Sequence, residues 1–165
     1  MNITEAKNEI FRVVINYFKK TDKSQIPHTV CVVYYTHIIS QMENIPERES
    51  LLLEISAILH DVGCPNSKKK FGNTLPHNQE TEGALLVPVF LEKLITGKIL
   101  TEKECEWIKT VVGSHHNHLS AQKFSFEIMA DADMIVNNQE GYYDGKNFDI
   151  QKALYTESAR KLYKI

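Results

Sequence analysis

The chain has no apolar stretch near the roughly 18 to 20 residues that a membrane-spanning helix requires, so we expect no membrane segment. Its three cysteines, Cys31, Cys64 and Cys105, are widely spaced and form no CxxC pair. Because the first residues are polar and show no signal-peptide pattern, we expect a cytoplasmic protein with reduced thiols rather than a disulfide framework. The formal net charge of -2 gives no general attraction to nucleic acid or to anionic membranes. Any recognition of a phosphate group must therefore depend on a few side chains at one site rather than on the overall charge.

Helical periodicity is present along nearly the whole chain of 165 residues, whose 42% hydrophobic content fits one globular domain with one core. The expected helices cover residues 3–20, 27–42, 46–61, 78–95, 101–115, 125–138 and 150–163. Segment 64–76 is predicted to be a long loop, and residues 124–126 give the only weak strand signal. We therefore predict an all-α, single-domain bundle of about six to seven helices over residues 1–165.

The most informative motif is His60-Asp61, which follows the mostly apolar run 51–59 and precedes Val62-Gly63. A neutral imidazole and a carboxylate are both good ligands for a divalent metal. A lone His-Asp pair is more often an ordinary turn or a salt bridge. A charged group deep at the end of an apolar helix, however, needs a partner, and a cation is a ready one. The pair therefore predicts a metal site.

Two histidines precede this motif, and only one of them can join it. His28 and His37 lie nine residues apart on one predicted helix, so at ~100° per residue they point to opposite faces. His28 is at the start of its helix, where a loop can bring it beside another element. We choose His28 as a ligand and interpret His37 as an ordinary core or surface histidine.

Further imidazoles follow the motif, and they cluster where the helix predicted over residues 101–115 ends. A protonated histidine at a helix C-terminus is favourable, which explains one exposed residue, His118, but not three neighbours. We keep His115 and His116 as candidate ligands. His77, just before the helix predicted over residues 78–95, is compatible with a ligand and equally with a loop residue.

Asp131 and Asp133 complete the candidate ligands, on a helix that is otherwise mostly apolar. Residues i and i+2 of a helix diverge by about 200°, so both carboxylates cannot face one ion. One should be a ligand, and the other should orient a ligand imidazole by a hydrogen bond. The alternative is a pair of exposed carboxylates in one helical turn.

The series His28, His60-Asp61 and Ala132-Asp133 resembles the H…HD…D signature of the HD-domain superfamily of metal-dependent phosphohydrolases. The similarity covers roughly residues 25–140, which leaves flanking helices over residues 3–20 and 150–163. A small bacterial group of predicted hydrolases within that superfamily is similar in the segments 26–29, 59–63, 70–72, 79–83, 115–116 and 131–133. The resemblance implies that Asp133, which precedes Met134-Ile135, is the final ligand rather than Asp131.

The resemblance also implies a second metal ion. Members with two metals add histidines between the doublet and the last aspartate, and His77 with His115 or His116 occupies that order here. The implied cofactor is therefore one or two divalent ions of Mn, Fe, Ni, Co or Zn.

Three positions depart from the pattern of the superfamily. Cys31 stands where many members have arginine, and Cys64 stands where members that cleave cyclic dinucleotides have lysine. Gly141-Tyr142-Tyr143 is not the GYP motif of those members. These departures argue against cleavage of cyclic dinucleotides.

The resulting hypothesis is hydrolysis of a phosphate ester or anhydride by a metal-activated water. Asp61 would orient that water as well as bind the metal. Lys70, in the lysine run 68–70, would offset developing charge. Glu80 or Glu82 would support a ligand or give a proton to the leaving group, although either could simply stabilise the start of its helix.

The expected partner is a small phosphorylated substrate, such as a nucleotide, with neither nucleic acid nor membrane involved. Tyr142, Tyr143 and Phe148 could stack on a nucleobase, or they could pack the last helix onto the core. One alternative is a di-iron HD-domain oxygenase, whose ligand order is similar. The other is a non-catalytic ligand-binding module. The substrate and the oligomeric state, a homodimer included, stay open.

Overall fold

The computed structural model describes residues 1–116 and 124–164, and every helix or strand assigned within these ranges is a helix. The elements are α1 (Ile3–Thr21), α2 (Gln25–Met42), α3 (Glu47–Leu59), α4 (Cys64–Phe71), α5 (Pro76–Thr96), α6 (Glu102–Val112), α7 (Phe124–Gln139), α8 (Ile150–Ala153) and α9 (Glu157–Tyr163). The all-α class is confirmed, with more helices in the described part than the six to seven predicted. None of the described helices combines the length and the hydrophobicity that crossing a bilayer requires.

The extra helices come from two segments that the sequence pattern misassigned. Residues 64–71 form α4 instead of a loop, with Pro65 in the first turn and Gly72 at the end in a left-handed conformation, φ 71°. Proline fits a first turn and glycine fits a helix end, so the residues that suggest a loop delimit a short helix. Residues 150–163 divide into α8 and α9 because the Thr156 side chain caps α9, accepting a bond from Ala159 N–H.

The weak strand signal at residues 124–126 is also wrong, because this segment begins α7. The other predicted boundaries lie close to the observed ones. The capping box of Thr101 and Glu104 is present at the start of α6, as the sequence indicates. Pro88 lies inside α5.

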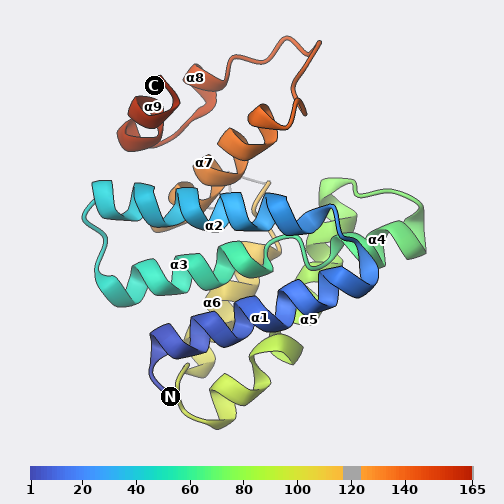
Figure 1. Ribbon diagram of the computed structural model, residues 1–165, viewed down its shortest axis with the longest axis vertical. Coiled ribbons are helices and arrows are strands. Elements are labelled where there is room, and N and C mark those ends of the chain that lie inside the picture. The colour runs from blue at the N-terminus through green and yellow to red at the C-terminus, as the bar shows by residue number, and fades with distance from the viewer. Residues whose placement is uncertain (117–123, 165) are drawn as a thin grey trace.

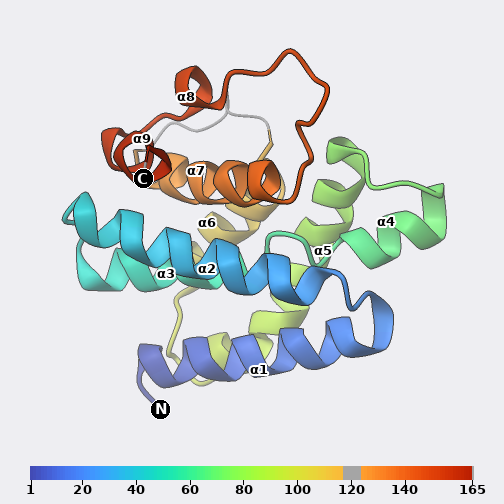
Figure 2. The ribbon, with the colours of Figure 1, turned by 45° about the horizontal axis from the view of Figure 1, so that its top comes forward.

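Helix α3 is the centre of the molecule and contributes to both hydrophobic clusters. Leu53 and Ala57 pack with residues of α2, α7, α8 and α9, whereas Ile55 and Leu59 pack with residues of α1, α5 and α6. Figure 2 shows α2 and α3 as a middle layer between α7 and α1; Figure 1 shows the same arrangement from another side. Because α3 is covered on both sides, its sequence is apolar nearly all round and His60 at its end is fully buried.

The turn that follows α3 lies directly against the start of α5. A Cβ atom on Gly63 would lie 2.0 Å from the Gln79 carbonyl oxygen and 2.4 Å from the Gly83 nitrogen. Glycine at position 63 therefore permits an approach that no other residue allows. The approach brings Gln79 and Glu80 beside the His60-Asp61 motif.

Candidate metal centre

Four side chains meet where α3 ends, and they come from α2, from the turn after α3 and from α7. His28 Nε2 lies 3.1 Å from His60 Nε2 and 3.1 Å from Asp133 Oδ1. Asp61 Oδ2 lies 3.6 Å from His28 Nε2 and 3.5 Å from His60 Nε2. One donor atom each of His28, His60 and Asp133 lies within 4.8 Å of the other two, and all three residues are buried. These atoms are arranged as ligands of one ion would be.

Hydrogen bonds on the far side of each ring fix which nitrogen faces the cluster. His60 Nδ1 donates to the Ala57 carbonyl oxygen at 2.7 Å, and His28 Nδ1 donates to Glu140 Oε2 at 3.0 Å. With Nδ1 protonated, Nε2 of a neutral imidazole carries a lone pair. Two lone pairs 3.1 Å apart repel each other unless a proton or a cation lies between them. Bonds of this kind commonly orient histidines that bind metals.

Protons hold this cluster together when no other cation is bound. Burial lowers the pKa of His28, but the bond to Asp133 and the charges of Asp61 and Asp133 outweigh it and raise that pKa from 6.5 to about 9. Burial would raise the pKa of Asp133, yet its bonds with His28 and His60 hold it well below 3.8. At neutral pH the two carboxylates thus face protonated imidazole, and a metal ion competes with that proton.

The two oxygens of Asp61 have different neighbours. Oδ2 faces His28 and His60, whereas Oδ1 lies 3.4 Å from Cys64 Sγ and 3.9 Å from His115 Nε2. Burial, followed by the charge of Asp61, raises the pKa of Cys64, so the thiol stays protonated and donates to Oδ1. Cys64 therefore helps to keep Oδ2 directed at the two imidazoles.

A second group of donors, Glu80, His115 and His116, adjoins the first. His115 Nδ1 donates to the Val112 carbonyl oxygen at 2.8 Å. Burial lowers the pKa of His115 to about 4, with His116 and His60 adding to the effect. The ring is therefore neutral at physiological pH, and the lone pair of its Nε2 accepts a hydrogen bond from Gln79 Nε2.

Glutamate and glutamine side chains of α5 hold His116 in this second group. Glu80 Oε1 accepts a bond from the His116 backbone N–H at 2.8 Å and lies 3.3 Å from His116 Nδ1. Gln79 Nε2 lies 3.1 Å from His115 Nε2 and 3.1 Å from His116 Nδ1. Burial lowers the pKa of His116, but the bond to Glu80 and nearby carboxylates outweigh it and raise that pKa. His116 is therefore the imidazole of this group that holds a proton more readily.

Two other candidates have structural positions outside the cluster. Both carboxylate oxygens of Asp131 accept bonds at 2.8 Å, from the backbone N–H groups of Tyr155 and Thr156. Asp131, predicted as an alternative ligand or as a residue that orients a ligand imidazole, instead anchors the chain before α9. His37 Nδ1 lies 3.0 Å from Glu54 Oε1, in agreement with its interpretation as an ordinary histidine.

Three further predicted residues also lie away from the centre. His77 is exposed on the first turn of α5, as is Thr81 one turn later, so this side of the helix faces solvent. Lys70 Nζ lies 2.8 Å and 2.7 Å from the two oxygens of Glu82, and this ion pair joins α4 to α5. Neither Lys70 nor Glu82 lines the pocket described below. His118 lies outside the described residues.

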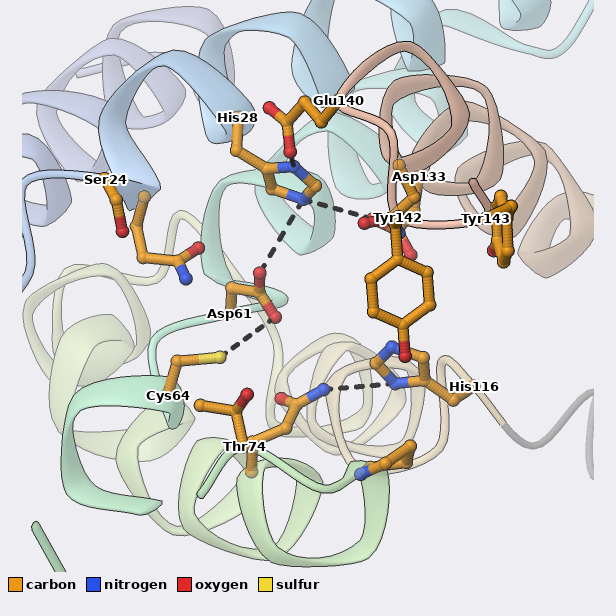
Figure 3. A pocket seen from close by; sticks show the side chains of 14 residues that line it. Ser24, His28, Asp61, Cys64, Thr74, His116, Asp133, Glu140, Tyr142 and Tyr143 are labelled. Atoms are coloured by element: carbon orange, nitrogen blue, oxygen red, sulfur yellow. Dashed lines mark hydrogen bonds and ion pairs between the residues drawn. The ribbon is translucent and has the colours of Figure 1, made fainter. Parts of the chain in front are cut away.

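A cavity of about 440 Å³ opens beside the cluster (Figure 3). His28, Asp61, Asp133 and His116 line it together with one further carboxylate, two tyrosines and uncharged side chains, namely Glu140, Tyr142, Tyr143, Ser24, Gln25, Cys64, Thr74, Pro76, Gln79 and Asn137. Its volume falls within the roughly 300–1,000 Å³ of ordinary small-molecule sites. The candidate ligands are therefore accessible to a substrate of modest size.

Sequence reasoning missed two side chains that contact the candidate ligands. Glu140 pairs with His28 and follows Asp133 by seven residues, which is two helical turns. That spacing is a signal that could have placed Glu140 on the same face as Asp133. Gln79 contacts both His115 and His116, but a glutamine in a helix carries no signal that distinguishes it from a surface residue.

Comparison of the chain with protein-family models finds no match, and comparisons with curated proteins and with solved structures find no significant similarity. The functional interpretation therefore depends on the geometry of this centre and on the order of its motifs along the chain.

Proposed function

We propose that the protein is a metal-dependent phosphohydrolase of the HD type that acts on a small phosphate ester. The convergence of His28, His60, Asp61 and Asp133 carries this proposal, because these are the residue types and the order of the H…HD…D signature. Imidazole nitrogens with inward lone pairs and carboxylate oxygens suit Mn, Fe, Ni, Co or Zn. A cation between His28 Nε2 and His60 Nε2 would satisfy both lone pairs, so the residues present fit such an ion.

A divalent ion at these four side chains would polarise a phosphoryl oxygen and lower the pKa of a bound water toward neutrality. Glu140 would hold the His28 ring, and the Ala57 carbonyl would hold the His60 ring, each through Nδ1. The Cys64 thiol would hold Asp61 Oδ1, which leaves Oδ2 for the ion. The chain thus prepares the donor atoms before an ion arrives.

His116 is the residue that we assign to give a proton to the leaving oxygen. It lines the cavity, and Glu80 both fixes its backbone and faces its Nδ1, so Nε2 is the atom that can reach a substrate. Glu80 then acts through His116 rather than on the substrate itself. The ion pair of Lys70 and Glu82 lies outside the cavity lining, and we assign it no part in the reaction.

The test is phosphate release from a panel of phosphate esters, with Mn, Co, Ni or Fe added to the chelator-treated protein. Asp61→Ala should abolish release, whereas Glu92→Ala, at an exposed position of α5 outside the cavity, should leave it unchanged. Release that survives Asp61→Ala would remove the hydrolase assignment. Tight metal binding without turnover of any ester would favour the non-catalytic ligand-binding module.

The second donor group favours one competing function. Glu80, His115 and His116 offer donor atoms within 4.8 Å of one another, which supports binding of a second ion. Two adjacent ions are also what a di-iron oxygenase of this superfamily requires. Metal analysis of protein purified without oxygen, with a spectroscopic search for a mixed-valence iron pair, distinguishes the two. Detection of such a pair, without hydrolysis of any ester, would favour the oxygenase.

A further inference from the structure

We propose that the cavity selects a phosphate ester whose alcohol part carries hydroxyl groups and a flat ring, and that Tyr142 stacks on this ring. The inference rests on the proposed hydrolysis and adds a substrate class to it. The candidate ligands occupy only part of the cavity wall. The remaining wall consists of Tyr142, Tyr143, uncharged side chains and the Glu140 carboxylate, which is paired with His28. Its uncharged part is therefore available to the alcohol part of the substrate.

The backbone fixes where the Tyr142 ring lies. Gly141 has a left-handed conformation, φ 79°, which favours glycine, and its carbonyl oxygen accepts a bond from Asp144 N–H at 3.0 Å. Tyr142 N–H donates to the Asn137 carbonyl oxygen at 2.9 Å, so the turn is tied back to the end of α7. Tyr142 is thus presented to the cavity by a defined turn.

The two adjacent tyrosines of this turn have different surroundings. Tyr143 stacks on Phe148, with ring centroids 4.0 Å apart, and packs against the core. The side of the Tyr142 ring toward Lys146 is occupied by the Nζ atom, 3.7 Å from the ring centroid. Tyr142 is nevertheless 58% exposed, and Figure 3 shows its ring extending toward His116. Tyr143 therefore anchors the turn, and Tyr142 is the ring that a ligand can contact.

Two glutamine side chains of the cavity wall offer amide groups to hydroxyl or amino groups of a ligand. Gln25 and Gln79 both line the cavity. Their Oε1 atoms are buried and accept no hydrogen bond from any residue that the structure describes. A buried acceptor without a partner costs free energy, and a ligand that donates to it removes that cost. Together with the ring of Tyr142, these acceptors fit an ester such as a sugar phosphate that carries an aromatic base.

The experiment compares adenosine 5′-monophosphate with ribose 5-phosphate. In both, the water oxygen forms the new bond to phosphorus, and the bond to the oxygen on C5′ of the sugar breaks. The leaving alcohol takes up a proton, and inorganic phosphate is released. The two substrates share the reacting phosphate and the C5′ oxygen, and they differ at C1′, which carries the base in one and a hydroxyl group in the other. We expect kcat/KM to be about tenfold higher for the substrate with the base, because stacking on an aromatic side chain has an effect of this size.

Variants separate stacking from structural effects. Tyr142→Ala should lower kcat/KM for adenosine 5′-monophosphate about tenfold and leave ribose 5-phosphate within about twofold, whereas Tyr142→Phe should retain the preference. Gln25→Leu should lower kcat/KM for both substrates. Tyr34→Ala is the matched control, because Tyr34 is 63% exposed and lies outside this cavity.

The possible failures are distinguishable. Equal kcat/KM for the two substrates, or equal loss of both in Tyr142→Ala, would overturn the role of Tyr142 and leave the hydrolase assignment standing. If neither substrate is hydrolysed, calorimetric titration of the metal-loaded protein with the same two compounds decides. Binding of adenosine 5′-monophosphate that is about tenfold weaker in Tyr142→Ala supports the stacking site, and unchanged or absent binding refutes it.

Discussion

Two clusters of histidine and carboxylate, each with one histidine from α2, are neutralised in different ways. In the first, Glu54 of α3 accepts from Lys7 Nζ of α1 and from His37 Nδ1 of α2. In the second, Asp61 and Asp133 face His28 and His60. Among the described residues, no lysine or arginine pairs with either carboxylate of this second cluster.

This difference distinguishes a structural ion pair from a cluster that an external cation could bind. A lysine is a permanent cation at neutral pH, so the Glu54 cluster is electrically satisfied by the chain itself. The second cluster depends on protons held by imidazole, which a metal ion can replace. It also opens on a cavity. The second cluster, with no lysine or arginine paired to it among the described residues, is thus the one that could hold a metal ion.

The largest expected effect comes from removing one carboxylate from each cluster. Asp61→Asn should weaken Mn binding at least about 100-fold, because a ligand is lost while the side-chain volume is kept. Glu54→Gln should leave Mn affinity within about twofold. Calorimetric or spectroscopic Mn titration of the two variants measures this contrast. Equal loss of affinity in both variants would mean that the second cluster is not the metal centre.

The next largest effect tests the first cluster through folding stability. Lys7→Met leaves the buried Glu54 carboxylate without its fixed cation and should lower the free energy of unfolding by about 3 kcal/mol. The double variant Lys7→Met with Glu54→Leu should recover most of that loss, because no buried charge remains. Urea unfolding monitored by circular dichroism provides the values. A loss below about 0.5 kcal/mol for the single variant would contradict the structural role.

The pH dependence of metal binding provides a third test, in which metal affinity should change about tenfold per pH unit. The pKa of His28 in the metal-free protein is about 9, above its ordinary value of 6.5. Its contribution to stability is therefore fully present below pH 6.5 and is lost as the pH rises through 9. Since an ion must displace this proton, metal affinity should rise about tenfold per pH unit between pH 7 and 8.5.

The measurement for this test is calorimetry in buffers of different ionisation enthalpy, which counts the protons released on metal binding. About one proton per ion is expected at pH 7.5. In the metal-free protein, the melting temperature should fall between pH 6.5 and pH 9.5, and saturating metal should remove that fall. A melting temperature and a metal affinity that do not change over this range would contradict the protonated state of His28.

The sequence predicts most helices from local periodicity, and it predicts the main donors of the second cluster from their residue types and their order along the chain. Angular reasoning indicates that His28 and His37 cannot face one ion together, and that Asp131 and Asp133 cannot either. The choice of Asp133 over Asp131 comes from the resemblance of its motif. Neither inference says what the excluded residue does. Asp131 binds the backbone before α9, which lies more than 20 residues further along the chain.

The errors arise where a residue's partner belongs to an element that the sequence pattern does not predict. Lys70 pairs with Glu82 because residues 64–71 form α4, and a loop prediction for that segment leaves both side chains without an assigned partner. His77 is exposed because of the rotation of α5 about its axis. The face of α5 that lies against Gly63 carries Gln79 and Gly83, and this is a tertiary contact that the sequence pattern does not predict.

The smallest predicted effect concerns Cys64, which contacts the second cluster without joining it. Cys64→Ala removes the donor to Asp61 Oδ1, so Mn affinity should fall about tenfold, as expected for residues that orient a metal ligand. Cys64→Ser keeps a donor at this position and should stay within about threefold of the unchanged protein. Cys105→Ala removes another buried thiol, which α6 contributes to the hydrophobic core, and serves as the control. Equal affinities in the two Cys64 variants would show that the thiol fills space and does not orient Asp61.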